Sequence, residues 1–548
     1  MTNYIVIMGG VISSVGKGII TSSIGKLIEA QGYSVTAMKI DPYINMDAGT
    51  MRPTEHGEVF VTEDGFETDQ DLGNYERFID GCKTTRNSSV TTGQIYSHVI
   101  NRERKGEFNG KCVEVIPHIP LEVMRRIRLV AEQSKADFVL IEIGGSVGEY
   151  QIYPFVDAVR RMKFEKEKIV TCLVGYLPIP ESVGEQKSKP LQEAVNTIRM
   201  QGVIPDFVIG RSKVAMDSTR IKKIAYNCSI EEEDIISSPN VASIYEVPII
   251  LKSQELDIKI LSKFGLNYSR AKEKLFKPWE DQIKKFKSAS KEITIGIAGK
   301  YFDTGDFKLE DSYISVIQSV LHPAIEHDAK VNFVWIDSKE FEGVDSKEIM
   351  VKRLSKLNGL IIPGGFGASG IQGKINAIEY ARKNKLPILG LCYGFQCMVI
   401  EYARNICKLA DANTTEIDVS THNPVIDLIE DQKKKLEKHE FGASMRLGVY
   451  NANLIQGSLV SRLYGSLKAS ERHRHRYEVN PKYVEILEKN GLIFSGRSPD
   501  GTLMEYLELP QKVHPFFVAT QAHPEFKSKF LKPNPLFDGF VKACLKIL

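Results

Sequence analysis

The sequence predicts an α/β protein with two doubly wound, mostly parallel sheets. Short apolar runs alternate with stretches of helical spacing in the first half of the chain, at 35–40, 138–143, 169–174 and 207–209. The same alternation returns in the second half, at 331–336, 360–362 and 387–391. Buried parallel strands joined by crossover helices produce this pattern. A chain of 548 residues is also too long for one hydrophobic core.

The two sheets are separated by a stretch without a buried-strand pattern. From Leu275 to Glu292 the residues are mostly charged or aromatic, and Ile293–Gly299 then opens a new strand and turn. We therefore expect three parts: a first domain over 1–265, a linker over 266–292 and a second domain over 293–548.

Composition excludes several classes of partner. The apolar content of 42% is ordinary for a globular protein, and a net charge of +3 gives no field favouring nucleic acid. No apolar run approaches the roughly 18 residues of a membrane span. The eight cysteines contain no C-x-x-C pair, which is typical of reduced thiols in a cytoplasm. We expect a cytoplasmic protein with neither a nucleic-acid nor a membrane partner.

The first element of the N-terminal domain is a strand that runs into a glycine-rich loop. Tyr4–Met8 is apolar, residues 9–18 read Gly-Gly-Val-Ile-Ser-Ser-Val-Gly-Lys-Gly, and a helical stretch follows. Such a turn aims backbone N–H groups and a helix dipole at phosphates, and Lys17 adds a positive charge. The spacing departs from the strict Walker pattern, since Gly18 stands where Ser or Thr would hold magnesium. A plain glycine-rich turn is the alternative.

Polar stretches follow at 38–45, 56–65 and 68–78, and the apolar strand Leu140–Ile143 carries a carboxylate at Glu142. A buried carboxylate is costly unless it meets a cation. We therefore expect Asp71 and Glu142 to be magnesium ligands beside nucleotide phosphates. A solvated acidic loop is the alternative. It fits Asp69 better than Glu142, which isoleucines flank.

The C-terminal domain contains a cysteine elbow, Gly390–Gln396, and a distant Gln-Ala-His-Pro-Glu at 521–525. The apolar run before the elbow and the helical spacing after it place Cys392 on a sharp strand-to-helix turn. There the positive end of a helix favours a thiolate. The alternative is a cysteine that is only a small buried hydrophobe. Pro363–Gly367 can supply backbone donors for an oxyanion, and Arg472–Tyr477 can clamp a carboxylate.

Together these residues resemble the class I glutamine amidotransferase family, which implies a flavodoxin-like C-terminal domain. In that family a cysteine attacks the glutamine side-chain amide, a histidine shuttles protons and a glutamate orients the histidine. The resemblance assigns these roles to Cys392, His523 and Glu525. It implies glutamine contacts at Gly365, Leu391, Cys392, Tyr393, Gly394, Phe395, Gln396, Glu416 and Arg476.

From Tyr4 to Phe540 the chain resembles the CTP synthase family, in which a P-loop-like synthetase domain is fused to a glutaminase domain. The resemblance implies that ATP phosphorylates the 4-oxygen of UTP and that ammonia from glutamine then displaces phosphate to give CTP. It implies Mg²⁺ as cofactor and CTP as feedback inhibitor. It also implies GTP activation through the loop 442–448, which contains Arg446, and a homotetramer.

The same resemblance assigns residues of the synthetase domain. Lys17 and Lys39 would stabilise the transferred phosphoryl group. The implied ATP contacts are Ser14, Val15, Gly16, Lys17, Gly18, Ile19, Asp71, Arg211 and Val241. The implied UTP and CTP contacts are Ser13, Glu149, Tyr150, Gln151, Lys187, Ser188, Lys189, Pro190, Leu191, Gln192 and Lys223.

The chain departs from the family pattern at the pyrimidine site. Where the family usually has Asp-Ile-Glu, the residues are Glu149, Tyr150 and Gln151. A glutamine can hydrogen-bond a ribose or a base but carries no charge. The departure therefore leaves two properties undecided: how strongly CTP inhibits, and how well the site distinguishes the sugars of nucleotides. Leu191 replaces a threonine that is common in the family.

Two alternatives to this function are considered. Another ATP-dependent amidotransferase synthetase could use a different acceptor, since cobyric acid synthetases and dethiobiotin synthetase share a related phosphate-loop fold. The stretches 38–78 and 187–192 argue against it, because they carry the resemblance to the UTP site. A non-enzymatic, filament-forming chain is the second alternative. The intact residues that argue against it are Cys392, His523, Glu525, Lys17, Asp71 and Glu142.

Overall fold

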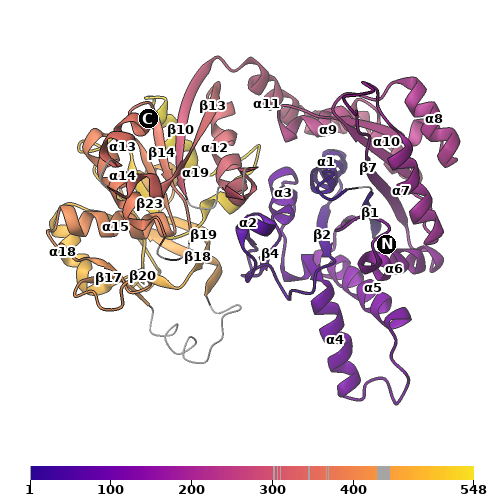
Figure 1. Cartoon of the computed structure of the whole chain (residues 1–548), viewed down its shortest axis with the longest axis horizontal. Coiled ribbons are helices and arrows are strands. Elements are labelled where there is room, and N and C mark those ends of the chain that lie inside the picture. The colour runs from indigo at the N-terminus through magenta and orange to yellow at the C-terminus, as the bar shows by residue number, and fades with distance from the viewer. Residues whose placement is uncertain are drawn as a thin grey trace. The chain divides into compact units, whose positions relative to one another are not determined.

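The computed structural model describes residues 2–10, 12–299, 303–304, 307–308, 310–343, 346–365, 367, 369–428 and 445–548. Contacts between residues divide the chain into two compact units. Unit 1 contains Met1–Ala48 and Asp71–Ile283, and unit 2 contains Gly49–Gln70 and Lys284–Leu548 (Figure 1). The second unit therefore includes a short segment from the first part of the sequence.

Unit 1 is built on a seven-stranded sheet with the order β5-β2-β6-β1-β7-β8-β9, in which every neighbouring pair is parallel. Its central strands are buried along almost their whole length because helices cover both faces. The strands are β1 (Asn3–Gly10), β2 (Val35–Asp41), β5 (Ser89–Thr91), β6 (Phe138–Ile143), β7 (Ile169–Tyr176), β8 (Phe207–Ser212) and β9 (Ile235–Pro239).

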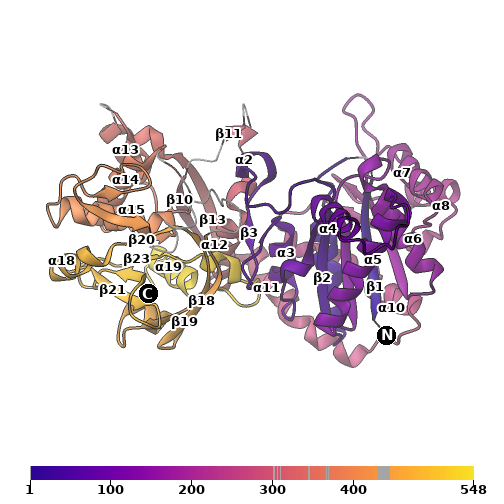
Figure 2. The ribbon, with the colours of Figure 1, turned by 90° about the horizontal axis from the view of Figure 1, so that it is seen from below.

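Two layers of helices enclose this sheet (Figures 1 and 2). One layer packs over the core formed by alternate residues of β1, β2 and β6, and contains α4 (Thr92–Arg104), α5 (Val115–Ser134), α6 (Tyr153–Phe164), α7 (Lys189–Met200) and α8 (Ser218–Cys228). The other contains α1 (Lys17–Ala30), α3 (Asp71–Phe78), α9 (Val247–Lys252), α10 (Leu256–Lys263) and α11 (Lys277–Ser288). The glycine-rich loop joins β1 to α1, so it lies at the carboxyl edge of the sheet, where α/β proteins bind ligands.

Unit 2 is built on a nine-stranded sheet with the order β13-β10-β14-β15-β23-β22-β21-β18-β19. The strands from β13 to β23 are parallel, and β22, β21, β18 and β19 extend the sheet in an antiparallel manner. These strands are β10 (Lys291–Gly299), β13 (Ala329–Asp337), β14 (Gly359–Ile362), β15 (Ile388–Leu391), β18 (Arg446–Leu454), β19 (Lys468–His475), β21 (Ile493–Arg497), β22 (Met504–Glu508) and β23 (Phe517–Thr520). The predicted fold class of two doubly wound sheets is confirmed. The antiparallel extension was not predicted.

Helices cover both faces of this sheet as well. One core is closed by α13 (Ser346–Leu354), α14 (Ile371–Asn384), α15 (Tyr393–Asn405) and α18 (Val484–Lys489). The opposite core is closed by α12 (Ile314–Glu326), α17 (Leu459–Tyr464) and α19 (Pro535–Cys544). Short strands complete the unit: β11 (Asp303–Thr304), β12 (Phe307–Lys308), β16 (Asn413–Thr414), β17 (Pro424–Leu428) and β20 (Tyr477–Val479).

The segment from Gly49 to Gln70, called the hairpin segment below, lies in sequence between β2 and α3, two elements of unit 1. It contains α2 (Pro53–His56) and the antiparallel pair β3 (Phe60–Val61) and β4 (Glu67–Thr68). Its contacts nevertheless group it with unit 2, where Val449 donates a backbone hydrogen bond to Glu63. The boundaries 1–265 and 293–548 remain a prediction.

The predicted linker contains the helix α11, whose first half belongs to unit 1. Trp279 of this helix is fully buried against the rings of Phe78 and Tyr245, and its indole N–H donates to the carbonyl of Tyr245 at 2.8 Å. The ammonium of Lys26 lies 5.4 Å from the centre of the indole ring. These contacts hold the start of α11 on the helical layer that contains α1.

Within the part of the chain that the structure describes, no helix combines the length and the apolar character that crossing a bilayer requires.

Trp279→Ala should lower the free energy of unfolding of unit 1 by about 3–5 kcal/mol, because it leaves a cavity among buried aromatic rings. Urea denaturation followed by far-UV circular dichroism measures the change. Tyr226→Ala is the control, since Tyr226 is 87% exposed and its replacement should change stability by less than about 0.5 kcal/mol. Equal losses in the two variants would contradict the anchoring contact assigned to Trp279.

Candidate active site

The backbone at Cys392 makes the sharp turn that the sequence predicts. Cys392 lies between β15 and α15 with φ 51° and ψ −98°, a left-handed conformation that L-residues seldom adopt. The first turn of α15 passes so close to β14 that a Cβ on Gly394 would lie 2.0 Å from the carbonyl oxygen of Ile362. A glycine is therefore required at position 394. The nucleophile elbow of this chain depends on that close approach.

The thiol of Cys392 is 3% exposed and has partners from β19 and from the residue that follows β23. Its Sγ donates to the carbonyl oxygen of Arg474 at 3.7 Å, and the side-chain amide of Gln521 donates to Sγ at 3.7 Å. The sulfur also faces the N-terminus of α15, whose dipole favours negative charge. The helix N-terminus and the amide of Gln521 suit a thiolate nucleophile, whereas the hydrogen bond to Arg474 is made by the protonated thiol. Neither partner was predicted from the sequence.

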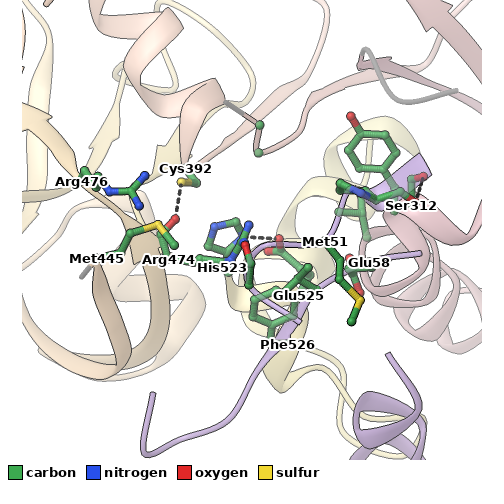
Figure 3. A pocket seen from close by; sticks show the side chains of 17 residues that line it. Met51, Glu58, Ser312, Cys392, Met445, Arg474, Arg476, His523, Glu525 and Phe526 are labelled. Atoms are coloured by element: carbon green, nitrogen blue, oxygen red, sulfur yellow. Dashed lines mark hydrogen bonds and ion pairs between the residues drawn. The ribbon is translucent and has the colours of Figure 1, made fainter. Parts of the chain in front are cut away.

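His523 and Glu525 form the remainder of the predicted triad. Nδ1 of His523 lies 2.7 Å from Oε1 of Glu525, and the imidazole stacks on the ring of Phe526 at 5.1 Å between centroids. Nε2 has no hydrogen-bond partner of normal geometry among the described residues. The imidazole lies between Cys392 and Glu525 (Figure 3). Burial alone would lower the pKa of His523. The negative charges of Cys392 and Glu525 outweigh burial and raise this pKa to about 10.

A cavity of about 210 Å³ opens in front of these three side chains. Gly364 and Gly365 of the predicted oxyanion loop lie in its wall, with Gly364 next to Cys392. Arg476 lies at the same end of the cavity as Cys392 (Figure 3). Met51, Pro53, Glu58 and Val59 of the hairpin segment form part of the wall. The cavity therefore combines a nucleophile, a base, backbone donors and a guanidinium that suits a carboxylate.

Some of the other predicted glutamine contacts make hydrogen bonds near this cavity, and others are buried in the cores of unit 2. Glu416 accepts a hydrogen bond from the backbone N–H of Gly367 at 2.8 Å, so it braces the oxyanion loop. Tyr393 donates its hydroxyl to the carbonyl of Gly367, and Gln396 donates to the carbonyl of Tyr477. Leu391 and Phe395 are fully buried in the two cores of unit 2.

Arg446 begins strand β18 and is largely buried. Its guanidinium pairs with Glu478 at 3.1 Å and Glu505 at 2.7 Å, and it covers the ring of Tyr450. The raised pKa of Glu478, about 8, results from burial first and then from the charge of Glu505, while Arg446 opposes both. Residues 442–444 of the predicted GTP loop lie outside the described residues. The function assigned to Arg446 remains a prediction.

In unit 1 the predicted phosphoryl-transfer residues gather at the carboxyl edge of the sheet. The ammonium of Lys39 forms an ion pair with Asp71 and lies 3.2 Å from Oε1 of Glu142. Lys17 donates to the carbonyl of Gly145 at 2.9 Å. A Cβ on Gly18 would lie 2.1 Å from Oδ1 of Asp71, so the glycine-rich loop and Asp71 are in close contact. Glycine therefore has a steric reason to stand where a strict Walker loop has Ser or Thr.

Two further side chains belong to this cluster and were not assigned from the sequence. Asp41 lies 3.8 Å from the ammonium of Lys39, and Tyr75 donates to Oε2 of Glu142 at 2.5 Å. Asp41 ends β2, the strand that pairs with β6, and this strand-end position was the available signal. Burial lowers the pKa of Lys17, and the nearby Glu142 opposes that effect.

A magnesium ion fits this cluster by its donor set. Among the residues that the structure describes, no three or more His, Cys, Asp and Glu side chains are grouped to hold a metal. Magnesium in phosphoryl-transfer sites usually takes only one or two protein carboxylates, with phosphates and waters completing its shell. Asp71 and Glu142 supply such oxygens, and the hydroxyl of Tyr75 orients Glu142.

The predicted ATP contacts surround the glycine-rich loop. Ser14 is exposed, and Ser14 and Gly16 take left-handed backbone conformations with φ 55° and 93°. Ser13, a predicted pyrimidine contact, is exposed beside them. Arg211 lies against Gly16 and donates to the carbonyls of Ser238 and Pro239. Val15 is buried, Ile19 and Val241 are half-buried.

The predicted pyrimidine contacts differ in how far their side chains are exposed. The amide of Gln151 donates to the carboxylate of Glu149 at 2.7 Å, and both side chains are exposed. Leu191 is fully buried in the core, where it packs against Gly175. The side chain at position 191 therefore faces the core, and the pyrimidine contact assigned to this position stays a prediction. The other predicted positions are Tyr150, Lys187, Lys189, Pro190 and Lys223 on or near the surface, and Ser188 and Gln192, which are buried and hydrogen-bonded to each other.

Comparison with known proteins decides the family. Residues 3–266 match the family model "CTP synthase N-terminus", and residues 308–543 match "Glutamine amidotransferase class-I". The CTP synthase of Methanococcus maripaludis is 48% identical over 548 residues, covering 99% of each chain. The CTP synthase of Archaeoglobus fulgidus is 48% identical over 544 residues, covering 99% of this chain and 98% of that one. The chain belongs to the CTP synthase family.

A solved structure is similar to part of the chain. The glutaminase domain of Trypanosoma brucei CTPS with bound acivicin is 35% identical, with a TM-score of 0.43. The match covers 46% of this chain and 94% of that one. The resemblance to the CTP synthase family, drawn from the sequence, is confirmed by the relatives that match the whole chain. The individual site residues remain predictions that the geometry above supports.

Glu525→Gln should move the basic limb of glutamine hydrolysis to lower pH. The reactive pair is a thiolate with an imidazolium, and it is lost as pH rises through the pKa of His523, about 10. Removing the carboxylate removes one of the charges that raise this pKa, so the pair is lost earlier. The pH profile of kcat/KM for glutamine hydrolysis measures the shift, with circular dichroism at each pH to confirm folding. An unchanged basic limb would show that Glu525 does not stabilise the imidazolium.

Proposed function

We propose that this chain makes CTP from UTP, with ATP as the phosphoryl donor and glutamine as the nitrogen donor. The observation that carries the proposal is the presence of two complementary sites in one chain of the CTP synthase family. Unit 2 holds the Cys392–His523–Glu525 triad in a cavity, and unit 1 holds Lys17 and Lys39 with carboxylates beside a glycine-rich loop.

At the first site, the thiolate of Cys392 attacks the side-chain carbonyl of glutamine. Backbone N–H groups around Gly365 stabilise the oxyanion, and Arg476 holds the substrate carboxylate. His523 donates its Nε2 proton to the leaving nitrogen as the C–N bond breaks, which yields ammonia and a thioester. Water then attacks the thioester with His523 as base, releasing glutamate and restoring the thiolate. Glu525 keeps the imidazole oriented through Nδ1.

At the second site, the 4-oxygen of UTP takes the terminal phosphoryl group of ATP. Lys17 and Lys39 lie where they can neutralise the charge on the transferred group. A magnesium ion held by Asp71 and Glu142 would supply further positive charge to the phosphates. Before nucleotides bind, Lys39 is paired with Asp71, so we infer that this pair opens when ATP enters.

Ammonia completes the reaction when it attacks carbon 4 of the phosphorylated pyrimidine and phosphate leaves. Ammonia that escaped into neutral water would be protonated and would lose its nucleophilic lone pair. A protected route between the two reactions therefore belongs to the proposal.

Regulation and assembly follow from family membership and are part of the proposal. GTP would activate glutamine hydrolysis, CTP would inhibit, and the chain would act as a cytoplasmic homotetramer. Support for self-association comes from large apolar side chains that are 45–55% exposed on α4 and α5, namely Ile100, Val115 and Leu121.

Cys392→Ala should abolish CTP formation from glutamine plus GTP while leaving CTP formation from added ammonia. The reason is that the thiol acts only in the release of ammonia. CTP is measured in the wild-type chain and the variant with UTP, ATP and Mg²⁺ and either nitrogen source. Lys17→Ala is the complementary variant, because loss of phosphoryl transfer should remove both activities.

Equal loss of both activities in Cys392→Ala would contradict the division between the sites. A folded wild-type chain that hydrolyses glutamine but makes no CTP from either nitrogen source would contradict UTP as the acceptor.

Gln151→Glu should strengthen feedback inhibition by CTP. The substitution places a second carboxylate beside Glu149, as in the usual family pattern, and replaces the amide donor that now binds Glu149. The measurement is the CTP concentration that halves ammonia-dependent CTP formation. It should fall at least about threefold, because a hydrogen bond to a carboxylate is stronger than one to an amide by about 1 kcal/mol. Val183→Ala, an exposed position outside the predicted contacts, is the control. A half-inhibitory concentration that rises or stays the same would show that position 151 does not set the feedback.

A further inference from the structure

The hairpin segment is attached to the glutaminase cavity by an ion pair that involves Arg474. Nε of Arg474 lies 2.7 Å from Oε1 of Glu67 on β4, and Nη2 lies 3.5 Å from the carbonyl of Gly49. The two side chains of the ion pair are 13% and 3% exposed. They are separated by 407 positions in the sequence, and both belong to unit 2.

The same residue contacts the nucleophile through its backbone. The carbonyl oxygen of Arg474 accepts the hydrogen bond from Sγ of Cys392 at 3.7 Å. The side chain of Arg474 and its carbonyl therefore connect Glu67 of the hairpin segment with the thiol. A shift of β19 at this residue would move the carbonyl group that accepts the hydrogen bond of the thiol.

A second chain of contacts leads from the hairpin segment to the base. Phe60 of β3 packs edge-on against Phe526, with 5.1 Å between ring centroids and an interplanar angle of 65°. Phe526 in turn stacks on His523. The guanidinium of Arg472 lies over the ring of Phe60 and donates to the carbonyl of Val61 at 3.0 Å.

The third triad member is reached through α12. Glu58 of the hairpin segment accepts hydrogen bonds from the hydroxyl and the backbone N–H of Ser315. One turn further along the helix, Ser319 donates to the carbonyl of Glu525 at 3.1 Å. Cys392 and His523 are thus each separated from the hairpin segment by one residue, Arg474 and Phe526. Glu525 is separated from it by two, Ser319 and Ser315.

We propose that Arg474 is a positioning residue for glutamine hydrolysis, and that its ion pair with Glu67 makes the hairpin segment part of the machinery that aligns the triad. The proposal rests on the proposed function, because it assumes that Cys392 hydrolyses glutamine. Attack on an amide requires the sulfur, the imidazole and the oxyanion donors in register, and errors of about 1 Å cost up to about 100-fold in rate. The ion pair holds β19, and with it the carbonyl of Arg474, in the position that this alignment requires.

Arg474 also lines the cavity, so a direct contact with glutamine is the competing explanation. Glu67 separates the two explanations because it does not appear in the wall of that cavity. A substrate contact at Arg474 would raise KM when Arg474 is replaced and would leave a Glu67 variant nearly unchanged. A positioning pair lowers kcat in both variants.

The test uses full-length Glu67→Gln, Arg474→Gln and the double variant, with kcat and KM for glutamine hydrolysis as readouts. We expect each single variant to lose about tenfold in kcat with KM changed less than about twofold. The kcat of the double variant should be no lower than that of the single variant with the lower kcat, because both changes break the same interaction. Arg474→Lys, which keeps the charge, should recover part of kcat.

Arg382→Gln is the matched control. Arg382 of α14 pairs with Glu401 in the same unit, with side chains 13% and 0% exposed, and neither residue lies in the wall of the cavity. Removing this pair disturbs unit 2 to a similar degree, so thermal unfolding should shift comparably. The rate of glutamine hydrolysis should nevertheless change less than about twofold.

Two results would overturn the proposal: a normal kcat in Glu67→Gln, or an effect of Arg474→Gln confined to KM. If Arg474→Gln does not fold, Glu67→Gln and Arg474→Lys preserve side-chain size and still decide the question. Failure of the proposed function gives a different result, because the wild-type chain itself would then hydrolyse no glutamine.

Discussion

The left-handed backbone of Cys392 is the constraint on which the glutaminase unit depends. A non-glycine residue in such a conformation costs on the order of 1–3 kcal/mol and persists only where its surroundings enforce it. Here β15 fixes the residue from one side, α15 begins immediately after it, and the backbone N–H of Cys392 donates to Thr520 on β23 at 2.8 Å. The strain places the thiol at a helix N-terminus, in front of a cavity.

The cost of burying charged groups is a second constraint, and the two units offset this cost in different ways. In unit 2 the charges of the triad are opposite and adjacent, and their attraction outweighs the burial that would otherwise deprotonate His523. In unit 1 Lys39 neutralises the carboxylates of Asp71 and Glu142. The first site is therefore charged and ready before its substrate arrives. In the second the charges are already paired with one another.

Local sequence patterns predicted most of what is local in the structure. The strand, glycine and helix spacing around Lys17 and Cys392 identified both loops, because each loop is determined by its immediate neighbours. The antiparallel strands from β22 to β19 were not predicted. β18 has several exposed positions and β19 is mostly polar and charged, so neither has the continuous apolar run by which the parallel strands were recognised. Leu191 was assigned to a ligand contact by position alone, and only tertiary packing shows that its side chain is in the core.

The contacts that complete the sites were the least accessible to sequence reasoning. Gln521 and Arg474 act on Cys392 through an amide and a carbonyl, and neither group has a sequence signature of its own. Arg446 stands in a stretch that reads as a loop, yet it is buried between two carboxylates that follow it by 32 and 59 positions. Long-range ion pairs of this kind leave no periodicity in the sequence.

The hairpin segment has a consequence for how this architecture can be divided and recombined. Its residues come from the first part of the gene, but they form a wall of the cavity in the other unit. A chimera that exchanged only the C-terminal portion between two relatives would therefore join a foreign cavity to a native wall. The modular boundary of this enzyme follows its contacts, and a transplantable glutaminase module has to include two separate stretches of coding sequence.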